Sequence, residues 1–431
     1  MLSLQLELNK LLKGKLELNK LPNSDTLNPL TSRICKSMNS KQRIAAAMDH
    51  KKPDRVPVMC QLALGHYFLN CSDRPSEIWF NSETFANVLV ELQQKYNFDG
   101  ILINIPGRPH DWKNNLKSYK RIDNNEHLYW KSGLETVFPP DDNPQTYRPG
   151  QTPLERANYS TVDIDDPATY RLPGYVWNTW HAPDLWDIDP QADLSDTAAY
   201  PAWFTSALEK VQQLAPDVSI HVEVFSPFTH FMELFGYEQA LLALIDDPSK
   251  CHQVLAVFTR IVLAQVELYA GCQPDAVLVS SAFAGAGFIS RKMYEDFVVP
   301  YEDHVFRAIR GFGSKSYVHT CGAIGDRLDL MSQTSVDGID TLDPPPLGTV
   351  YLVDAKSKYG GRFFFKGNLD AVNEMLNADD RTFEQAVKER IRIGKPGSGY
   401  ILSSACSVAP HVKPERLKRL AVLAMQLGKY Q

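Results

Sequence analysis

Eight short apolar runs, each separated from the next by a longer stretch, constrain the fold of this chain more than any other feature. Most of the intervening stretches have the periodicity of amphipathic helices. Parallel strands connected by crossover helices produce this order, so we expect an α/β protein built as a (β/α)8 TIM barrel. The expected strands cover residues 56–62, 99–105, 218–225, 275–280, 315–320, 336–341, 362–367 and 398–404.

The competing architecture is an open, doubly wound sheet. No glycine-rich turn follows the first expected strand, which counts against the dinucleotide-binding form of that fold. The barrel is therefore the preferred prediction. Its helices are expected at 82–96, 200–214, 229–246, 249–271, 290–312, 323–333, 348–359, 370–393 and 413–428.

Two segments do not follow the alternation. Residues 1–39 precede the barrel, which we expect to span 40–431, and contain the repeat Leu-Glu-Leu-Asn-Lys-Leu at 6–11 and 16–21. This N-terminal extension is compatible with a small hairpin or with a homodimer contact, and we assign it no chemistry. Residues 106–175 are rich in Pro, Asn, Asp, Trp and Tyr, and predict a β-hairpin insertion after the second strand, on the face where barrel loops form active sites.

Composition restricts the possible partners and compartment. The chain has 431 residues and a net charge of −6, without a block of basic residues, so nucleic acid and acidic membrane surfaces are not expected partners. Seven scattered cysteines indicate free thiols or metal ligands in a reducing compartment. With no long apolar span and no signal peptide at the N-terminus, the sequence predicts a soluble cytoplasmic protein.

The pair His319 and Cys321, at the end of the fifth expected strand, is the main candidate for chemistry. Side chains two residues apart on a strand point to the same face. Cys406, just past the eighth strand, would reach the same mouth of the barrel. Two sulfurs and one imidazole are ligands that zinc prefers, and three protein ligands leave a position open, as in catalytic zinc sites. Taken singly, each residue could instead fill the core.

Other polar residues are expected near the same mouth. Glu223 lies near the end of the third strand and is the candidate catalytic group, although a carboxylate there could also orient substrate or pair with an arginine. Candidates for substrate binding are Asn368, Asp343 and His66. For Asn368 a role in stabilising a turn is equally compatible with the sequence.

Several motifs, in the same order, resemble the uroporphyrinogen decarboxylase superfamily. They are Asn-Ser-Lys-Gln-Arg-Ile-Ala-Ala-Ala-Met-Asp-His at 39–50, Pro-Asp-Arg-Val-Pro-Val at 53–58, Ser-Pro-Phe-Thr at 226–229 and Lys-Gly-Asn-Leu-Asp at 366–370. The His-x-Cys-Gly motif at 319–322, with Cys406, resembles the zinc site of one branch, the methylcobamide:thiol methyltransferases. The resemblance implies a bound Zn²⁺ ion at His319, Cys321 and Cys406, and a corrinoid (methylcobalamin) as co-substrate, free or carried by a partner corrinoid protein.

Other branches of the superfamily fit less well. The decarboxylases carry an Arg-Gln-Ala-Gly-Arg run at their first strand to grip a polycarboxylate, whereas residues 60–67 here contain no arginine. Serines at 280–281 and the stretch 404–410 also depart from the methyltransferase pattern, which leaves the substrate open. The leading hypothesis is a zinc-dependent methyltransferase acting on a small-molecule thiol or similar acceptor.

Two alternatives belong to other functional classes. One is a metal-free, decarboxylase-like lyase acting on a carboxylated ring, for which Arg108 and Arg148 in the insertion are the candidate cationic groups. The other is a non-catalytic subunit that binds a corrinoid protein.

Overall fold

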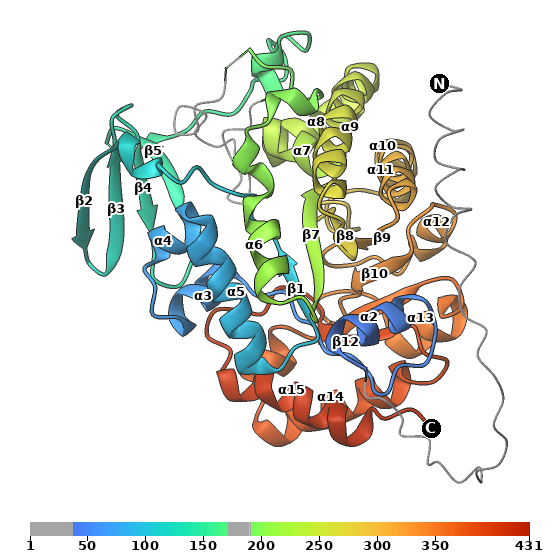
Figure 1. The fold of residues 1–431 in the computed structure, drawn as a ribbon. Helices are drawn as coiled ribbons and strands as arrows, with labels where there is room; N and C mark the ends of the chain where they lie inside the picture. The colour runs from blue at the N-terminus through green and yellow to red at the C-terminus, as the bar shows by residue number, and fades with distance from the viewer. Residues whose placement is uncertain (1–37, 151, 171–188, 190) are drawn as a thin grey trace, which may run out of the picture. The chain divides into compact units, whose positions relative to one another are not determined.

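A computed structural model describes residues 38–150, 152–170, 189 and 191–431. Residues 38–431 belong to one compact unit. Its central sheet has seven parallel strands whose order in space follows their order in the chain (Figure 1). They are β1 (Gly100–Ile103), β7 (Ser219–Phe225), β8 (Ala276–Ser280), β9 (Lys315–His319), β10 (Gly338–Thr341), β11 (Phe364–Leu369) and β12 (Tyr400–Ser404). The predicted TIM-barrel fold is confirmed.

The eighth position of the barrel is taken by residues 57–62, which form bridges rather than a regular strand. On one side, the Leu402 amide donates to the Pro57 carbonyl at 2.9 Å. On the other side, the Asp99 amide donates to the Val58 carbonyl at 2.7 Å. The segment therefore lies between β12 and β1 and closes the ring, where the first strand was predicted. Its irregularity has a physical reason, because Pro57 has no N–H to donate to a ladder.

Helices follow the strands as expected. The closest agreement is α5 (Ser82–Tyr96), which begins where the Asn81 side chain accepts from two backbone amides and ends at Asn97 in the left-handed conformation. The remaining helices are α2 (Ser40–Met48), α3 (Leu64–Asn70), α4 (Pro75–Phe80), α6 (Ser206–Leu214), α7 (Pro227–Phe235), α8 (Tyr237–Asp246), α9 (Pro248–Ala270), α10 (Arg291–Phe297), α11 (Val299–Gly311), α12 (Leu328–Ser332), α13 (Leu352–Tyr359), α14 (Asp380–Gly394) and α15 (Pro414–Leu427).

Three predicted helices are divided in the structure. The stretch predicted at 229–246 is broken at Gly236 into α7 and α8. The stretch predicted at 290–312 is broken at Val298, and α11 restarts with Pro300 in its first turn, a position where proline is tolerated. The stretch predicted at 370–393 becomes a short π-helical turn, Asn373–Asn377, followed by α14, which begins where the Asp379 side chain caps the Thr382 amide.

The segment after β1 forms a separate antiparallel sheet of five strands in place of a single hairpin (Figure 1). It contains β2 (Leu116–Ile122), β3 (Asn125–Trp130), β4 (Glu135–Phe138), β5 (Gln145–Arg148) and β6 (Thr152–Pro153). The hairpin between β2 and β3 turns at Asp123 and Asn124, both with positive φ, as two-residue hairpin turns require. The sheet packs against α4, because the Trp130 ring meets the Phe80 ring edge-on.

One described helix, α9, is long and apolar enough to cross a membrane by length and composition alone. Just over half of its apolar window, 56%, is buried inside the protein, against α7, α11 and β7. We read α9 as a core helix of the barrel layer. The predicted N-terminal extension lies, apart from its last two residues, outside the described part of the chain.

The interior of the barrel is apolar at its amino-terminal end. Buried side chains from α2 meet buried side chains that point inward from the strands. We call the strand residues of this cluster the barrel floor: Met59, Leu102, Ala276, Leu278, Tyr317, Phe364 and Ile401. Since strand side chains alternate, the residue two positions after a floor residue also points inward, one step nearer the carboxyl end. Polar residues occupy those positions, and they form the candidate site.

Candidate metal centre and active site

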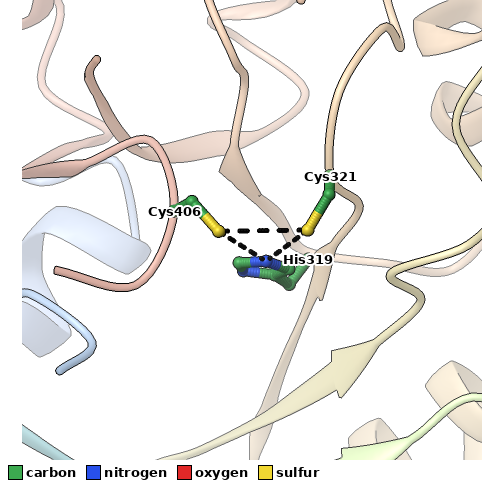
Figure 2. Close-up of side chains that lie close together, drawn as sticks. All are labelled: His319, Cys321 and Cys406. Atoms are coloured by element: carbon green, nitrogen blue, oxygen red, sulfur yellow. Dashed lines mark hydrogen bonds between the residues drawn. The ribbon is translucent and has the colours of Figure 1, made fainter. Parts of the chain in front are cut away.

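Strand periodicity brings the three predicted metal ligands together. His319 follows the floor residue Tyr317 by two positions on β9, and Cys321 follows it by two more. Cys406 stands two residues after the end of β12. Figure 2 shows the imidazole and the two sulfurs pointing toward one another at the carboxyl ends of these strands. This is the end of a TIM barrel at which active sites are built.

The distances between the ligand atoms suit one metal ion. Cys321 Sγ lies 3.4 Å from His319 Nε2 and 3.9 Å from Cys406 Sγ, and Cys406 Sγ lies 3.9 Å from His319 Nε2. A tetrahedral zinc ion, with bonds of about 2.3 Å to sulfur and about 2.0 Å to nitrogen, separates two sulfurs by about 3.8 Å and sulfur from nitrogen by about 3.5 Å. The donor set therefore fits zinc in both chemistry and spacing.

A buried carboxylate orients the histidine. His319 Nδ1 lies 3.1 Å from Asp340 Oδ2, and Asp340 Oδ1 accepts from Lys366 Nζ at 3.0 Å. All three residues are buried. Donation from Nδ1–H to Asp340 leaves Nε2 as the lone-pair nitrogen that faces the sulfurs, an arrangement common behind metal-bound histidines.

Without a metal, the three ligands share protons. The hydrogen bond between the two cysteines lowers the pKa of Cys406 well below its usual value and raises the pKa of Cys321 well above it. Burial lowers the pKa of His319, but Asp340 and Cys406 oppose this effect and bring it up to about 10. The metal-free site is thus held together by one thiolate, one thiol and one imidazolium.

Glu223 lies on the same inner face. It follows His221 by two positions on β7, and its carboxylate interacts with the Ser280 side chain and with the charge of His319. Burial raises the pKa of Glu223 to about 7. The carboxyl group can therefore gain and lose a proton near neutral pH, which suits the predicted catalytic role.

Asp343 stabilises the turn that follows Cys321. Its Oδ2 accepts from the Gly322 amide at 2.7 Å, directly after Cys321, where Gly322 has a positive φ of 77°. Burial raises the pKa of Asp343 to about 6. The contact fixes the turn that aims Cys321, and a role in substrate binding remains a prediction.

The other two predicted substrate-binding residues are engaged elsewhere. His66 Nε2 lies 2.8 Å from the Tyr96 hydroxyl, and its Nδ1 lies 3.2 Å from the Pro410 carbonyl oxygen. Asn368 donates to the Leu342 carbonyl at 2.7 Å and accepts from Arg390 at 3.0 Å. Their contacts are structural, so their substrate roles stay predictions that this geometry does not favour.

Comparisons with known proteins identify the class. Residues 179–426, more than half of the chain, match the uroporphyrinogen decarboxylase (URO-D) family, and the chain belongs to it. Curated uroporphyrinogen decarboxylases are similar: that of Ruthia magnifica is 24% identical over 189 residues, 43% of this chain and 52% of the relative. That of Nocardia farcinica is 26% identical over 198 residues, 44% and 52% of the two chains. The chain thus spans about half the length of the curated relatives it matches.

A solved structure resembles the whole barrel. A methyltransferase from Methanosarcina mazei superposes with a TM-score of 0.63, covering 90% of this chain and 99% of that one. The two sequences are 14% identical, so the likeness shows the fold. Within the family, this chain is an enzyme-type TIM barrel that carries a His-Cys-Cys centre at its mouth.

Proposed function

We propose that the protein is a zinc-dependent methyltransferase that moves a methyl group between a corrinoid, methylcobalamin, and a thiol or similar acceptor. The observation that carries the proposal is the meeting of His319, Cys321 and Cys406 at the carboxyl end of the barrel, at distances that suit zinc. The fold shared with a methyltransferase supports it.

The residues have separate roles. His319, Cys321 and Cys406 would hold zinc, and Asp340 fixes the imidazole so that Nε2 faces the metal position. When bound, zinc supplies a charge that lowers the pKa of a substrate thiol, so that the thiolate is available near neutral pH. Glu223, with its pKa raised to about 7, would accept the thiol proton, or fill the fourth ligand position before the thiol arrives.

The reaction balances without an external oxidant or reductant. The carbon–cobalt bond of methylcobalamin breaks with its electron pair on cobalt, giving cob(I)alamin. The acceptor sulfur forms the new bond to the methyl carbon, and the thiol proton is released. The barrel contributes by aligning the two reactants, which is a large source of rate acceleration in such transfers.

The alternative of a metal-free decarboxylase has less support from the site. Its two candidate cations do not face the metal centre: Arg108 is buried and donates to the carbonyls of Trp79 and Pro106, and Arg148 is exposed on β5 of the added sheet. A polycarboxylate needs bidentate cationic partners at the mouth. The similarity to relatives named as decarboxylases is therefore better explained by common ancestry than by a shared substrate.

The first experiment is metal analysis of the purified protein beside a Cys321→Ala/Cys406→Ala variant. We expect about one zinc per chain, lost in the double variant. Cys251→Ala, which removes a buried thiol on α9 away from the ligands, is the matched control and should keep its zinc. A wild-type protein that takes up no zinc under reducing conditions would contradict the proposal.

The second experiment follows methyl transfer from methylcobalamin to small thiols through the absorbance of cob(I)alamin. Turnover that depends on zinc excludes the non-catalytic corrinoid-binding subunit. A need for a separate corrinoid protein would identify the partner that supplies the methyl group.

Because thiolate ligands require reducing conditions, we also propose that the protein is cytoplasmic.

A further inference from the structure

The barrel presents a ring of inward polar side chains directly above its apolar floor. Each ring residue stands two positions after an inward residue on the same strand, so the alternation of strand side chains places it on the inner face. The ring contains one residue from each of the eight strand positions: Gln61, Asn104, Glu223, Ser280, His319, Asp340, Lys366 and Ser403. A barrel interior is more often filled with branched apolar side chains, so this layer needs an explanation.

Five of the eight residues satisfy one another. His319, Asp340 and Lys366 form the hydrogen-bonded series behind the metal centre. Glu223 interacts with Ser280 on the neighbouring strand. These five account for every charged group of the ring, and each has a partner.

The other three residues form an arc of unpartnered polar groups. Ser403 on β12, Gln61 on the closing segment and Asn104 just after β1 come from neighbouring strand positions. The three residues are at most 7% exposed. Ser403 Oγ, Gln61 Oε1 and both amide atoms of Asn104 make no hydrogen bond of normal geometry in the part of the chain that the structure describes, although the Tyr67 hydroxyl lies near Asn104 and the Cys60 thiol lies near Ser403.

Unpartnered groups at these positions are costly. A buried donor or acceptor without a partner costs about 1–3 kcal/mol, and such groups in native proteins usually meet water, an ion or a ligand. Four such atoms on neighbouring strand positions of the inner face therefore indicate a place where something polar binds. We name the three residues Gln61, Asn104 and Ser403 the polar arc.

The chemistry of the arc restricts its ligand. It offers the carboxamide oxygen of Gln61, the donor and acceptor of the Asn104 carboxamide and the Ser403 hydroxyl, and no charge. The two ring residues that can carry a positive charge both contact Asp340, Lys366 at 3.0 Å and His319 at 3.1 Å, and His319 also faces the two cysteine sulfurs. A sulfonate, phosphate or carboxylate would thus meet no free cation among the described ring residues, whereas a neutral group that both donates and accepts would satisfy the arc.

We propose that the polar arc binds an uncharged hydrogen-bonding group, a carboxamide or hydroxyl, of the methyl acceptor while the acceptor sulfur lies at the metal centre. This inference rests on the proposed function and specifies its substrate class: thiols with a neutral polar end. Specificity would come from the unpartnered polar atoms of the arc, since a site whose polar groups need hydrogen bonds strongly rejects a ligand that cannot form them.

The test compares matched thiols on the zinc-loaded protein by calorimetry. The probes share a two-carbon spacer and differ in their ends: 3-mercaptopropionamide, 3-mercaptopropionate, 2-mercaptoethanesulfonate and 1-propanethiol. We expect the amide to bind at least about ten-fold more tightly than the other three. Equal binding of all four, or tightest binding of either anion, would overturn the inference.

Variants locate the preference. Asn104→Leu should abolish the advantage of the amide over propanethiol, and Ser403→Ala should reduce it. Ser404→Ala is the matched control, because Ser404 is equally buried and unpartnered but occupies the alternate face of β12. Zinc content and melting temperature show that each variant is folded, and an unchanged preference in folded Asn104→Leu would contradict the proposal.

A thiol-free probe separates this inference from the proposed function. S-methyl-3-mercaptopropionamide, the product-like thioether, should bind the zinc-free protein more weakly than the loaded one, yet still in preference to the S-methyl derivative of propanethiol. If the protein takes up no zinc but keeps the amide preference, the methyltransferase proposal fails and the polar arc stands. If it holds zinc and transfers methyl groups without any amide preference, the arc is wrong and the function stands.

Discussion

Asp340 joins His319 to Lys366 through its two carboxylate oxygens, at 3.1 Å and 3.0 Å, from three adjacent strands of the barrel. The registers pair Asp340 with His319 on one side and with Lys366 on the other, so the sheet itself sets this contact. His319 is therefore held in place by the central sheet.

Asp340→Asn should weaken zinc binding. The amide keeps the shape of the carboxylate but removes its charge, and loss of such an outer partner typically costs about 10–100-fold in metal affinity. Competition with a chromophoric chelator measures the change. Asp337→Asn, at the start of the same β-strand region but hydrogen-bonded to Ser316 away from the site, is the control and should bind zinc normally.

Zinc uptake should release protons. The metal-free site holds a proton on His319 and one on Cys321, while the pKa of Cys406 is already low. Binding therefore releases about two protons, and the apparent affinity falls as the pH is lowered. Calorimetry in buffers of different ionisation enthalpy counts the protons. An affinity that does not change between pH 6 and pH 8 would contradict this ligand set.

Glu302 on α11 should make the protein less stable at alkaline pH. Its carboxyl is 1% exposed, near Ser281 and Ser226, and burial raises its pKa to about 7. An unfolded glutamate ionises near pH 4.5, so the folded state holds the extra proton between that pH and about 7. The free energy of unfolding therefore falls as the pH rises through this window, since the buried group must finally ionise.

Glu302→Gln tests this effect because it keeps the shape without the ionisation. The variant should match the wild type at pH 4.5 and exceed it by roughly 1–3 kcal/mol at pH 8. Denaturant unfolding at the two pH values gives the difference. A gap that is the same at both pH values would show that Glu302 stays ionised in the folded protein.

Asp99 should be among the most sensitive positions for stability. Its carboxylate is 1% exposed and accepts from Arg43 at 2.6 Å and from Arg55 at 2.8 Å, at the amino-terminal end of the barrel. Asp99→Ala leaves the buried Arg55 without a carboxylate partner, while Arg43 keeps Asp54 at 2.6 Å, and should cost about 3–5 kcal/mol in the free energy of unfolding. Asp380→Ala is the matched comparison, because its carboxylate pairs with Arg416 while 85% exposed, and it should cost far less.

The sequence was sufficient for the strand order and for the meeting of His319, Cys321 and Cys406, because both depend on local periodicity. His319 ends β9 and Cys321 lies two residues beyond it, and the place of Cys406 follows from the barrel. The helix breaks at Val298 and before Asp379, and the five-stranded sheet, depend on tertiary contacts that periodicity does not encode.

Substrate-binding residues were harder to predict for a different reason. His66 and Asn368 were chosen by residue type near a strand or loop, but their hydrogen-bonding groups are used within the fold. Lys366 and the polar arc were missed although a simple signal existed. Counting two positions beyond the inward apolar residues would have identified six of the eight ring residues, namely Gln61, Asn104, Ser280, His319, Lys366 and Ser403.

The pairing of Lys366 with Asp340 has a consequence for which metals the centre accepts. The two charges cancel, so the remaining core consists of a neutral imidazole and two thiolates with a total charge of −2. Before Glu223 or an acceptor thiolate takes the fourth position, only a divalent cation makes this three-ligand core electrically neutral. A buried net charge is expensive in a low-dielectric interior, so monovalent copper and trivalent iron would each leave an uncompensated unit. By neutralising Asp340, Lys366 thus favours the binding of divalent metal ions. The two sulfur ligands add a preference for soft metal ions.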